Sequence, residues 1–253
     1  MPRIGLCLSG GAARGIAHLG VLKALQELGI EISIISGVSS GAIASAFVAA
    51  GYTPDEVLQL IKDLPLPRLF RPALNKGILR SQSLQKIFQE HLGDKTFEEL
   101  PVKLIISAAD LIQGTTTYFR EGSLVDALLA SSSVPILYQP FAHNGKLLVD
   151  GGLINNLPVE CLTGGECDKI IGVHVNPLSH KENIRTIRQV SERIFHLAIN
   201  ANAQHRVGLC DFYLEPPRLK EFHIYAIGKA QEIFDVGYEY AHSLGKELQE
   251  LKL

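Results

Sequence analysis

The chain of 253 residues lacks the features that mark several protein classes. Its four cysteines have neither paired nor metal-ligand spacing, so we expect idle thiols and no disulfide framework or metal site. A formal net charge of -2 gives no basic footprint for a nucleic-acid partner. Neither a secretory leader nor an apolar run of bilayer length is present, so we expect a soluble, cytoplasmic protein.

The chain also lacks internal boundaries. No serine- or glycine-rich linker, charge block, repeat or low-complexity tract divides it, and 46% hydrophobic with 20% charged residues is a globular composition. We expect one domain over residues 1–253, with its motifs at about 4–160 and residues 165–253 completing it. Strand patterns that alternate with helical patterns predict a three-layer α/β/α fold, with helices on both faces of a mostly parallel sheet.

The most informative stretch is Gly-Val-Ser-Ser-Gly at residues 37–41. It follows an apolar strand pattern at residues 32–36 and precedes small residues at 42–46, which predicts a strand, a sharp turn and a helix. Such a turn strains the serine backbone and leaves no room for flanking side chains, which is why Gly37 and Gly41 bracket Ser39. We interpret Ser39 as a candidate nucleophile, and a loop serine without chemistry is the alternative.

A second glycine loop lies further upstream. Gly10 and Gly11 follow an apolar strand at residues 4–9, and a helical pattern then runs to Leu28, closed by Gly29. A loop that opens a helix directs backbone N–H groups at an anion.

Two nucleotide motifs do not fit this loop. Gly15 is followed by Ile16, not by the lysine of a phosphate-binding loop. Ala12 stands where a dinucleotide fingerprint has its second glycine, and the next strand ends without the acid that holds a ribose. A transient oxyanion beside Ser39 is the better interpretation if the two strands are parallel. The alternative is a loop that only allows close packing.

A candidate acid follows a predicted hairpin. Residues 141–149 contain the tight-turn pair Asn144 and Gly145, and the second strand delivers Asp150 to Gly151 and Gly152. Asp-Gly is also a common structural turn, so the position alone leaves both roles open.

Taken together, residues 9–15, 37–41 and 150–152 resemble the glycine loop, nucleophile elbow and aspartate motif of the patatin-like phospholipase family. The resemblance implies lipid ester hydrolysis by a serine acyl hydrolase through an acyl-enzyme, with Ser39 as nucleophile and Asp150 as general base. It implies no metal or organic cofactor, a lipid or acyl-ester substrate, and at most transient contact with a membrane surface. The implied oxyanion hole is Gly10, Gly11 and Ala12, with support from Arg14, Gly37, Gly41, Gly151 and Gly152.

One position departs from the family pattern. Where the family usually has a third glycine, this chain has Ala12, which would cost about 1 kcal/mol if the position needs a positive φ. Residues 131–135 resemble the small-residue segment before a proline that lines the family's site.

Two rival interpretations remain open. In a Ser-Asp-His esterase a histidine would activate the serine. With the usual order of serine, acid and then histidine, the candidates are His174, His180, His196, His205, His223 and His242. None of them lies in a glycine-marked loop, and His18 precedes the nucleophile. In the other interpretation, a regulatory protein of the same fold binds acyl chains without turnover.

Four further segments carry expectations. Residues 65–80 hold four basic residues and no acid, which fits a lipid contact or a surface connection. Asp110 is either a triad acid or a turn cap. A long helix is predicted at residues 184–202 with Ile187, Val190, Ile194, Leu197 and Ala198 on one face. A closing helix should run from 225 or 227 to 251.

Overall fold

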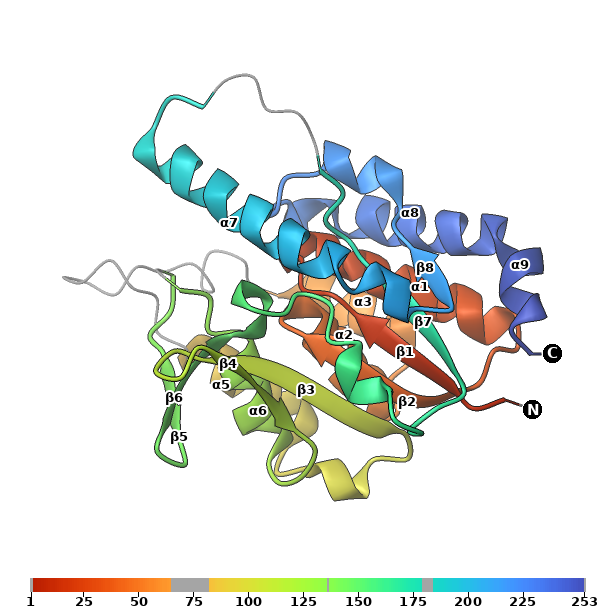
Figure 1. Cartoon of the computed structure of the whole chain (residues 1–253), viewed down its shortest axis with the longest axis horizontal. Coiled ribbons are helices and arrows are strands. Elements are labelled where there is room, and N and C mark those ends of the chain that lie inside the picture. Colours follow the sequence, from red (N-terminus) through yellow and green to blue (C-terminus); the bar gives the residue numbers. More distant parts are fainter. Residues whose placement is uncertain (1, 65–81, 136, 179–183, 253) are drawn as a thin grey trace.

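The computed structural model describes residues 2–64, 82–135, 137–178 and 184–252. Within them, one sheet has the strand order β5-β6-β3-β2-β1-β7-β8, and β4 also pairs with β3 (Figure 1). The strands are β1 (Ile4–Leu8), β2 (Ile32–Val38), β3 (Lys103–Asp110), β4 (Thr115–Phe119), β5 (Phe141–His143), β6 (Lys146–Asp150), β7 (Lys169–Val173) and β8 (Phe212–Leu214). The helices are α1 (Ala17–Glu27), α2 (Ser40–Ala49), α3 (Pro54–Asp63), α5 (Gln82–Leu92), α6 (Leu124–Ser131), α7 (Ile187–Gln204), α8 (Ala230–Ser243) and α9 (Gly245–Glu250).

The centre of the sheet is parallel, as predicted. β1 is buried along its whole length and pairs in parallel with β2 and β7, and β2–β3 and β7–β8 are also parallel. Leu8 pairs with Gly37, so the chain leaves β1 and β2 side by side at the carboxyl edge of the sheet. The glycine loop after β1 and the serine turn after β2 are therefore neighbours.

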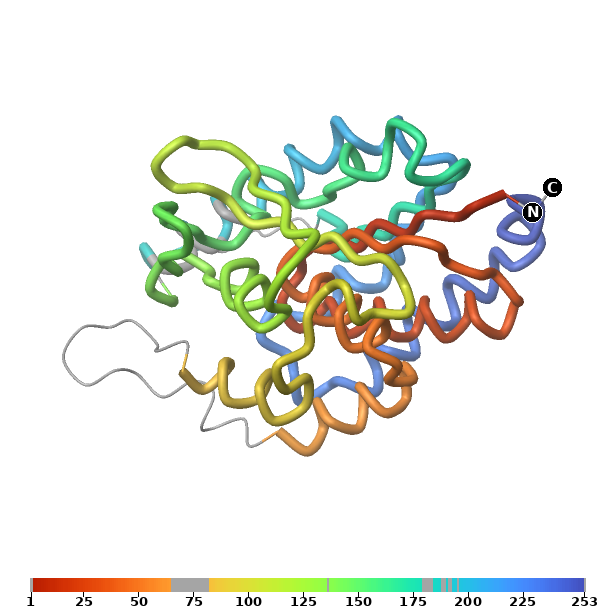
Figure 2. The backbone as a smooth tube through the Cα atoms, turned by 90° about the horizontal axis from the view of Figure 1, so that it is seen from below, coloured from red at the N-terminus to blue at the C-terminus, as the bar shows by residue number. Residues whose placement is uncertain are grey.

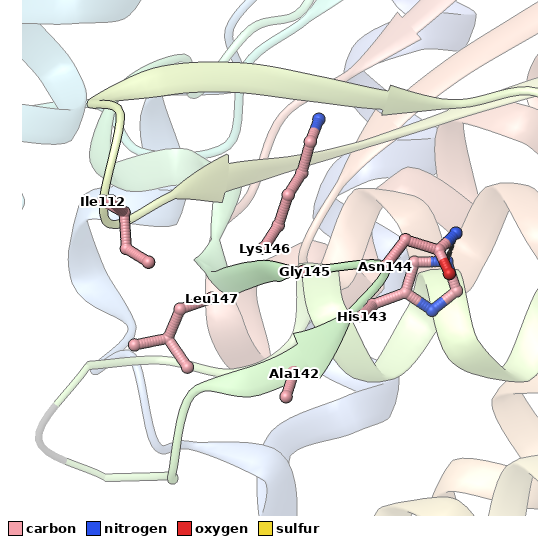
Figure 3. Close-up of a pocket in the computed structure, with 7 residues that line it drawn as sticks. All are labelled: Ile112, Ala142, His143, Asn144, Gly145, Lys146 and Leu147. Atoms are coloured by element: carbon pink, nitrogen blue, oxygen red, sulfur yellow. Dashed lines mark hydrogen bonds between the residues drawn. The ribbon is translucent and has the colours of Figure 1, made fainter.

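The predicted hairpin forms the antiparallel edge of the sheet. Its turn residues Asn144 and Gly145 have φ values of 47° and 75°, the positive values that a tight hairpin turn requires. β6 then pairs with β3 so that Asp150 lies opposite Ala108. A surface hollow over this hairpin is lined by its own residues and Ile112, and it includes neither Ser39 nor Asp150 (Figure 3).

The two layers that cover the sheet are unequal. The main hydrophobic core joins one face of the sheet to α1, α2, α3, α6 and α8. On the other face, a smaller cluster packs the segment around the 3-10 turn η4 (Glu160–Leu162) and Ala203 of α7 against Cys7, Ile34 and Ile105. Figure 2 shows α3 and α5 on the opposite side of the strands from η4, and the two chain ends side by side. The three-layer fold is thus confirmed.

Local signals in the sequence fix several element ends. Thr53 caps α3 in a capping box with Glu56, and Gly29 ends α1 with a φ of 66°. Asp110 accepts hydrogen bonds from the N–H groups of Ile112 and Gln113, at 3.0 and 3.2 Å. Of its two proposed roles, Asp110 therefore has that of a turn cap.

One expected boundary is wrong. The closing helix starts at Ala230 and is interrupted between α8 and α9. Among the candidate histidines, His174 directly follows β7, and His205 follows α7. Helix and strand ends depend on tertiary hydrogen bonds, here from the His174 N–H to the Leu214 carbonyl, which periodicity does not register.

The long helix forms, but its apolar stripe faces solvent. Ile187, Val190, Ile194 and Leu197 are 87%, 42%, 61% and 43% exposed, whereas the opposite side of α7 contains the buried residues His196, Ile199, Asn200 and Ala203. An amphipathic helix usually turns such a stripe to the core. The basic stretch at residues 65–80 lies outside the described residues.

The four cysteines are free thiols, and Cys7 and Cys161 are buried. Over the described ranges, no helix combines the length and apolarity needed to cross a bilayer.

Candidate active site

Ser39 occupies the tip of a strained turn between β2 and α2. Its φ of 53° and ψ of -123° lie in a region that residues other than glycine rarely adopt. A β-carbon at Gly37 would come within 2.8 Å of the backbone N of Ala42, and one at Gly41 within 2.5 Å of the Ser9 carbonyl oxygen. Both flanking positions therefore need glycine, as the sequence predicted, and the half-buried Ser39 is held at the carboxyl edge.

The glycine loop lies against this serine. A β-carbon at Gly10 would be 3.2 Å from that of Ser39 and 2.6 Å from the Asn156 Oδ1. Within the part of the chain that the structure describes, the N–H groups of Gly10, Gly11 and Ala12 donate no hydrogen bond. N–H groups without a partner beside a serine side chain are suited to stabilise the charge of an oxyanion.

Ala12 has the positive φ that the sequence comparison raised as a question. Its φ is 49°, and its side chain is exposed at the start of the 3-10 turn η1 (Ala12–Ile16). An L-residue with a β-carbon is disfavoured in this region by about 1 kcal/mol, and an exposed methyl group gains no packing in return.

We predict that Ala12→Gly raises the free energy of unfolding by about 0.5–1 kcal/mol, because relief of the positive φ outweighs the added freedom of the unfolded chain. Urea denaturation measures this effect. Ala13→Gly, at the next and buried position, is the matched control and should destabilise. Equal destabilisation by both variants would contradict the strain at Ala12.

Asp150 and Ser39 are both hydrogen-bonded to the same segment, residues 131–133. The Ser39 N–H donates to the Ser131 Oγ at 2.7 Å, and the Asp150 N–H donates to the Ser133 carbonyl oxygen at 2.9 Å. Residues 131–133 thus tie together two positions that are 111 residues apart in the chain. The small-residue segment lines the site, as the resemblance implied.

The Asp150 carboxyl is buried, and its pKa is raised towards neutral pH. It is 3% exposed, and burial raises its pKa from 3.8 to about 6, while the nearby Ser39 side chain and the Gly152 N–H lower it. The Gly152 N–H lies 2.8 Å from the Asp150 Oδ1. Gly151 is confined as well, since a β-carbon there would lie 2.8 Å from the Ser107 carbonyl oxygen. A carboxylate with a raised pKa is a better proton acceptor.

Arg14 supports the glycine loop from behind. It is 4% exposed, its Nε donates to the Phe222 carbonyl oxygen at 2.9 Å, and burial lowers its pKa to about 10. The Ala13 N–H donates to the Ile224 carbonyl oxygen at 3.0 Å nearby. The loop is therefore fastened to the segment that precedes α8.

A set of asparagines supports the site, and sequence reasoning missed it. The Asn176 Nδ2 donates to the Gly10 carbonyl oxygen at 2.5 Å, and its own carbonyl accepts from the Asn200 Nδ2 at 3.1 Å. Asn202 accepts from the Asn156 N–H at 2.8 Å and donates to the Gly152 carbonyl oxygen at 3.0 Å. The sequence feature that could have indicated this set is the pair Asn200 and Asn202 within a predicted helix, because asparagine has a low helix propensity.

The histidines serve other partners. His18 Nε2 lies 2.8 Å from the Ser9 carbonyl oxygen, and burial lowers the pKa of this histidine to about 4. His174 Nδ1 lies 2.7 Å from the Glu215 Oε1. Among the described residues, neither Ser39 nor Asp150 hydrogen-bonds a histidine. His180 lies outside the described residues.

No cluster of three or more His, Cys, Asp or Glu side chains with a metal-binding arrangement occurs among the residues described here.

The amino-acid sequence of this chain is similar to those of known proteins. The sequence profile of the patatin-like phospholipase family matches residues 6–162. An NTE family protein of Mycobacterium bovis, named as uncharacterised, is 36% identical over 179 residues, which are 69% of this chain and 49% of that protein. The lysophospholipase NTE1 of Kluyveromyces lactis is 27% identical over 98% of this chain and 19% of its own length. The chain thus spans half or less of the length of these relatives.

Solved structures match it in fold. VipD from Legionella pneumophila superposes with a TM-score of 0.62 at 14% identity, over 97% of this chain and 67% of that one. ExoU from Pseudomonas aeruginosa, in complex with SpcU, gives 0.54 at 16% identity, over 98% and 53%. At these identities the likeness concerns the fold alone. Since the family profile covers more than half of the chain and includes all three glycine motifs, the chain belongs to the patatin-like phospholipase family.

Proposed function

We propose that this protein is a serine acyl hydrolase that cleaves fatty-acyl esters of phospholipids or lysophospholipids through a Ser39–Asp150 dyad. The observation that carries the proposal is a carboxyl group, that of Asp150, which is buried beside the serine turn and has a pKa raised to about 6 by that burial. A serine hydroxyl needs a positioned base near neutral pH, and Asp150, whose pKa the Ser39 side chain lowers, is the candidate for that base.

The first half of the reaction forms an acyl-enzyme. Ser39 Oγ attacks the ester carbonyl carbon as its proton passes to the Asp150 carboxylate. The carbonyl oxygen becomes an oxyanion, which the N–H groups of Gly10, Gly11 and Ala12 accept. The tetrahedral intermediate then collapses, the bond to the alcohol breaks, and the proton on Asp150 leaves with the alcohol oxygen.

The second half releases the fatty acid. A water molecule gives one proton to Asp150 and attacks the acyl carbon, and the same loop holds the second oxyanion. Collapse breaks the bond to Ser39 Oγ, which takes the proton back from Asp150. Atoms and charges balance without a metal or an organic cofactor.

The substrate class is supported by the relatives. The family is described as patatin-like phospholipase, and the Kluyveromyces lactis relative, matched over nearly all of this chain, is named a lysophospholipase. Both names support the coarser part of the proposal, lipid ester hydrolysis.

The test is labelling with a fluorophosphonate, followed by intact mass, as a function of pH. Because Asp150 must be ionised to accept the proton, the labelling rate should rise with pH through about 6 and then level off. Hydrolysis of a short-chain ester should follow the same profile. A wild-type protein that is folded but unlabelled at every pH would overturn the proposal and favour the non-catalytic alternative.

Histidine variants test the triad alternative in the same assay. Glutamine at His174, His196, His205, His223 or His242 should leave labelling unchanged, because the structure shows none of them bonded to Ser39 or Asp150. Loss of labelling in one folded histidine variant would favour a Ser-Asp-His esterase.

A further inference from the structure

Helix α7 presents an apolar stripe to solvent. Six residues share one arc of about 100° on the helix. They are Ile187, Val190, Ile194, Leu197, Ala198 and Ala201, named here the α7 stripe, and all six are exposed. His196, Ile199, Asn200 and Ala203, on the opposite side, are buried. The α7 stripe therefore takes no part in packing this helix against the protein.

The buried side of α7 is fixed to the candidate active site. The Asn200 side chain donates to the carbonyl oxygen of Asn176, whose own side chain bonds the glycine loop at Gly10. The Asn202 side chain donates to the carbonyl oxygen of Gly152, two residues after Asp150. These polar anchors explain why the helix cannot turn its stripe inwards, since rotation would leave buried amides and carbonyls without partners. The stripe is therefore held in a constant orientation next to the site.

The stripe lies towards the carboxyl edge of the sheet. In Figure 1 the C-terminal half of α7 crosses the sheet, and its N-terminal half extends past the carboxyl ends of the parallel strands. Ser39 and the glycine loop lie at that same edge. Ile184, three residues before α7, is also exposed, at 37%.

The charge around the stripe differs in sign from that of the whole chain. Residues 184–204 carry Arg185, Arg188 and Arg193 against Glu192, a formal charge of +2, whereas the chain carries -2. A helical segment with a net positive formal charge and an exposed apolar stripe suits the surface of a membrane that contains anionic lipids.

We propose that the α7 stripe is the surface with which this protein docks on a lipid bilayer. The inference rests on the proposed function, because a lipid ester must leave a bilayer to reach a half-buried serine. With its outward side chains among the acyl chains, α7 places the bilayer at the edge of the sheet where Ser39 lies. A second copy fits less well, because a symmetric dimer through this face would bring two positive helices together.

The test measures binding to vesicles separately from catalysis. The double variant Ile194→Gln and Leu197→Gln removes two large apolar side chains with a residue that favours helix. On vesicles of phosphatidylcholine with phosphatidylglycerol, its partition coefficient should fall at least about 10-fold. Its hydrolysis of a soluble short-chain ester should match wild type, and its hydrolysis of vesicle phospholipid should fall with binding.

Leu209→Gln is the matched control. Leu209 is 44% exposed, like Leu197, but it precedes β8 and so lies towards the amino edge of the sheet, opposite the site. The Leu209→Gln substitution should leave vesicle binding unchanged. The pair of variants is also compared in a Ser39→Ala background, where binding is measured without turnover, so a failure of the proposed hydrolase activity does not affect the result.

Two outcomes would overturn the proposal. One is equal vesicle binding by wild type and the double variant. The other is a concentration-dependent dimer of the wild type, seen by sedimentation, that the double variant abolishes, because the stripe would then belong to a second copy.

Discussion

Ser39→Ala is expected to abolish fluorophosphonate labelling and to lower ester hydrolysis by about 10³-fold or more, because the substitution removes the atom that forms the acyl-enzyme. Intact mass gives the first result and turnover of a short-chain ester the second. The fold should persist, since alanine retains the β-carbon of the turn. Alanine also has the same difficulty with the φ of 53°, so the strain stays as it is in wild type.

The adjacent serine supplies the control. Ser40 begins α2, and its Oγ is buried without a hydrogen-bond partner in the described structure. Ser40→Ala should therefore keep full labelling. If Ser39→Ala still forms the adduct, or if only Ser40→Ala loses it, the assignment of the nucleophile is wrong.

Asp150→Asn should have the second large effect, a fall in labelling rate and turnover of about 10²–10⁴-fold, the usual contribution of a general base. The asparagine retains the shape of the carboxyl and accepts the Gly152 N–H, but it does not take the Ser39 proton. Retention of wild-type turnover by a folded Asp150→Asn protein would rule out the dyad.

The same variant should be more stable than wild type at neutral pH. The folded-state pKa of Asp150 is about 6 against an ordinary 3.8, so between these values the folded protein binds more protons than the unfolded chain. Stability of the wild type therefore falls as pH rises through this window, by at most about 3 kcal/mol. Asparagine carries no charge, so the stability advantage of the variant should appear between pH 4 and 6 and persist above pH 6.

Urea denaturation at a series of pH values measures this advantage. Asp110→Asn is the control, because Asp110 is also buried in the sheet but caps a turn with two backbone N–H bonds. It should lose about 1–2 kcal/mol and keep its fluorophosphonate labelling. A stability difference between Asp150→Asn and wild type that does not change with pH would contradict the raised pKa of Asp150.

The positions of the catalytic candidates followed from local sequence, because each depends on backbone geometry within a few residues. The bracket of Gly37 and Gly41 predicts the turn at Ser39, and Asn144 with Gly145 predicts the hairpin that carries Asp150. That Ser39 and Asp150 approach one another came from the family resemblance. Residue spacing alone left the roles of both Asp150 and Asp110 open, and the hydrogen bond from the Ile112 N–H decided the role of Asp110.

The sequence by itself determined the alternation of strands and helices, the strained serine turn and the glycine loop, since periodicity and glycine placement act over a few residues. Tertiary structure alone decided the raised pKa of Asp150, because burial of that carboxyl depends on β3, β6 and the segment at residues 131–133. It also decided the orientation of α7. Periodicity identified the apolar face of this helix, but the hydrogen bonds of Asn200 and Asn202 to distant carbonyl groups turn that face to solvent.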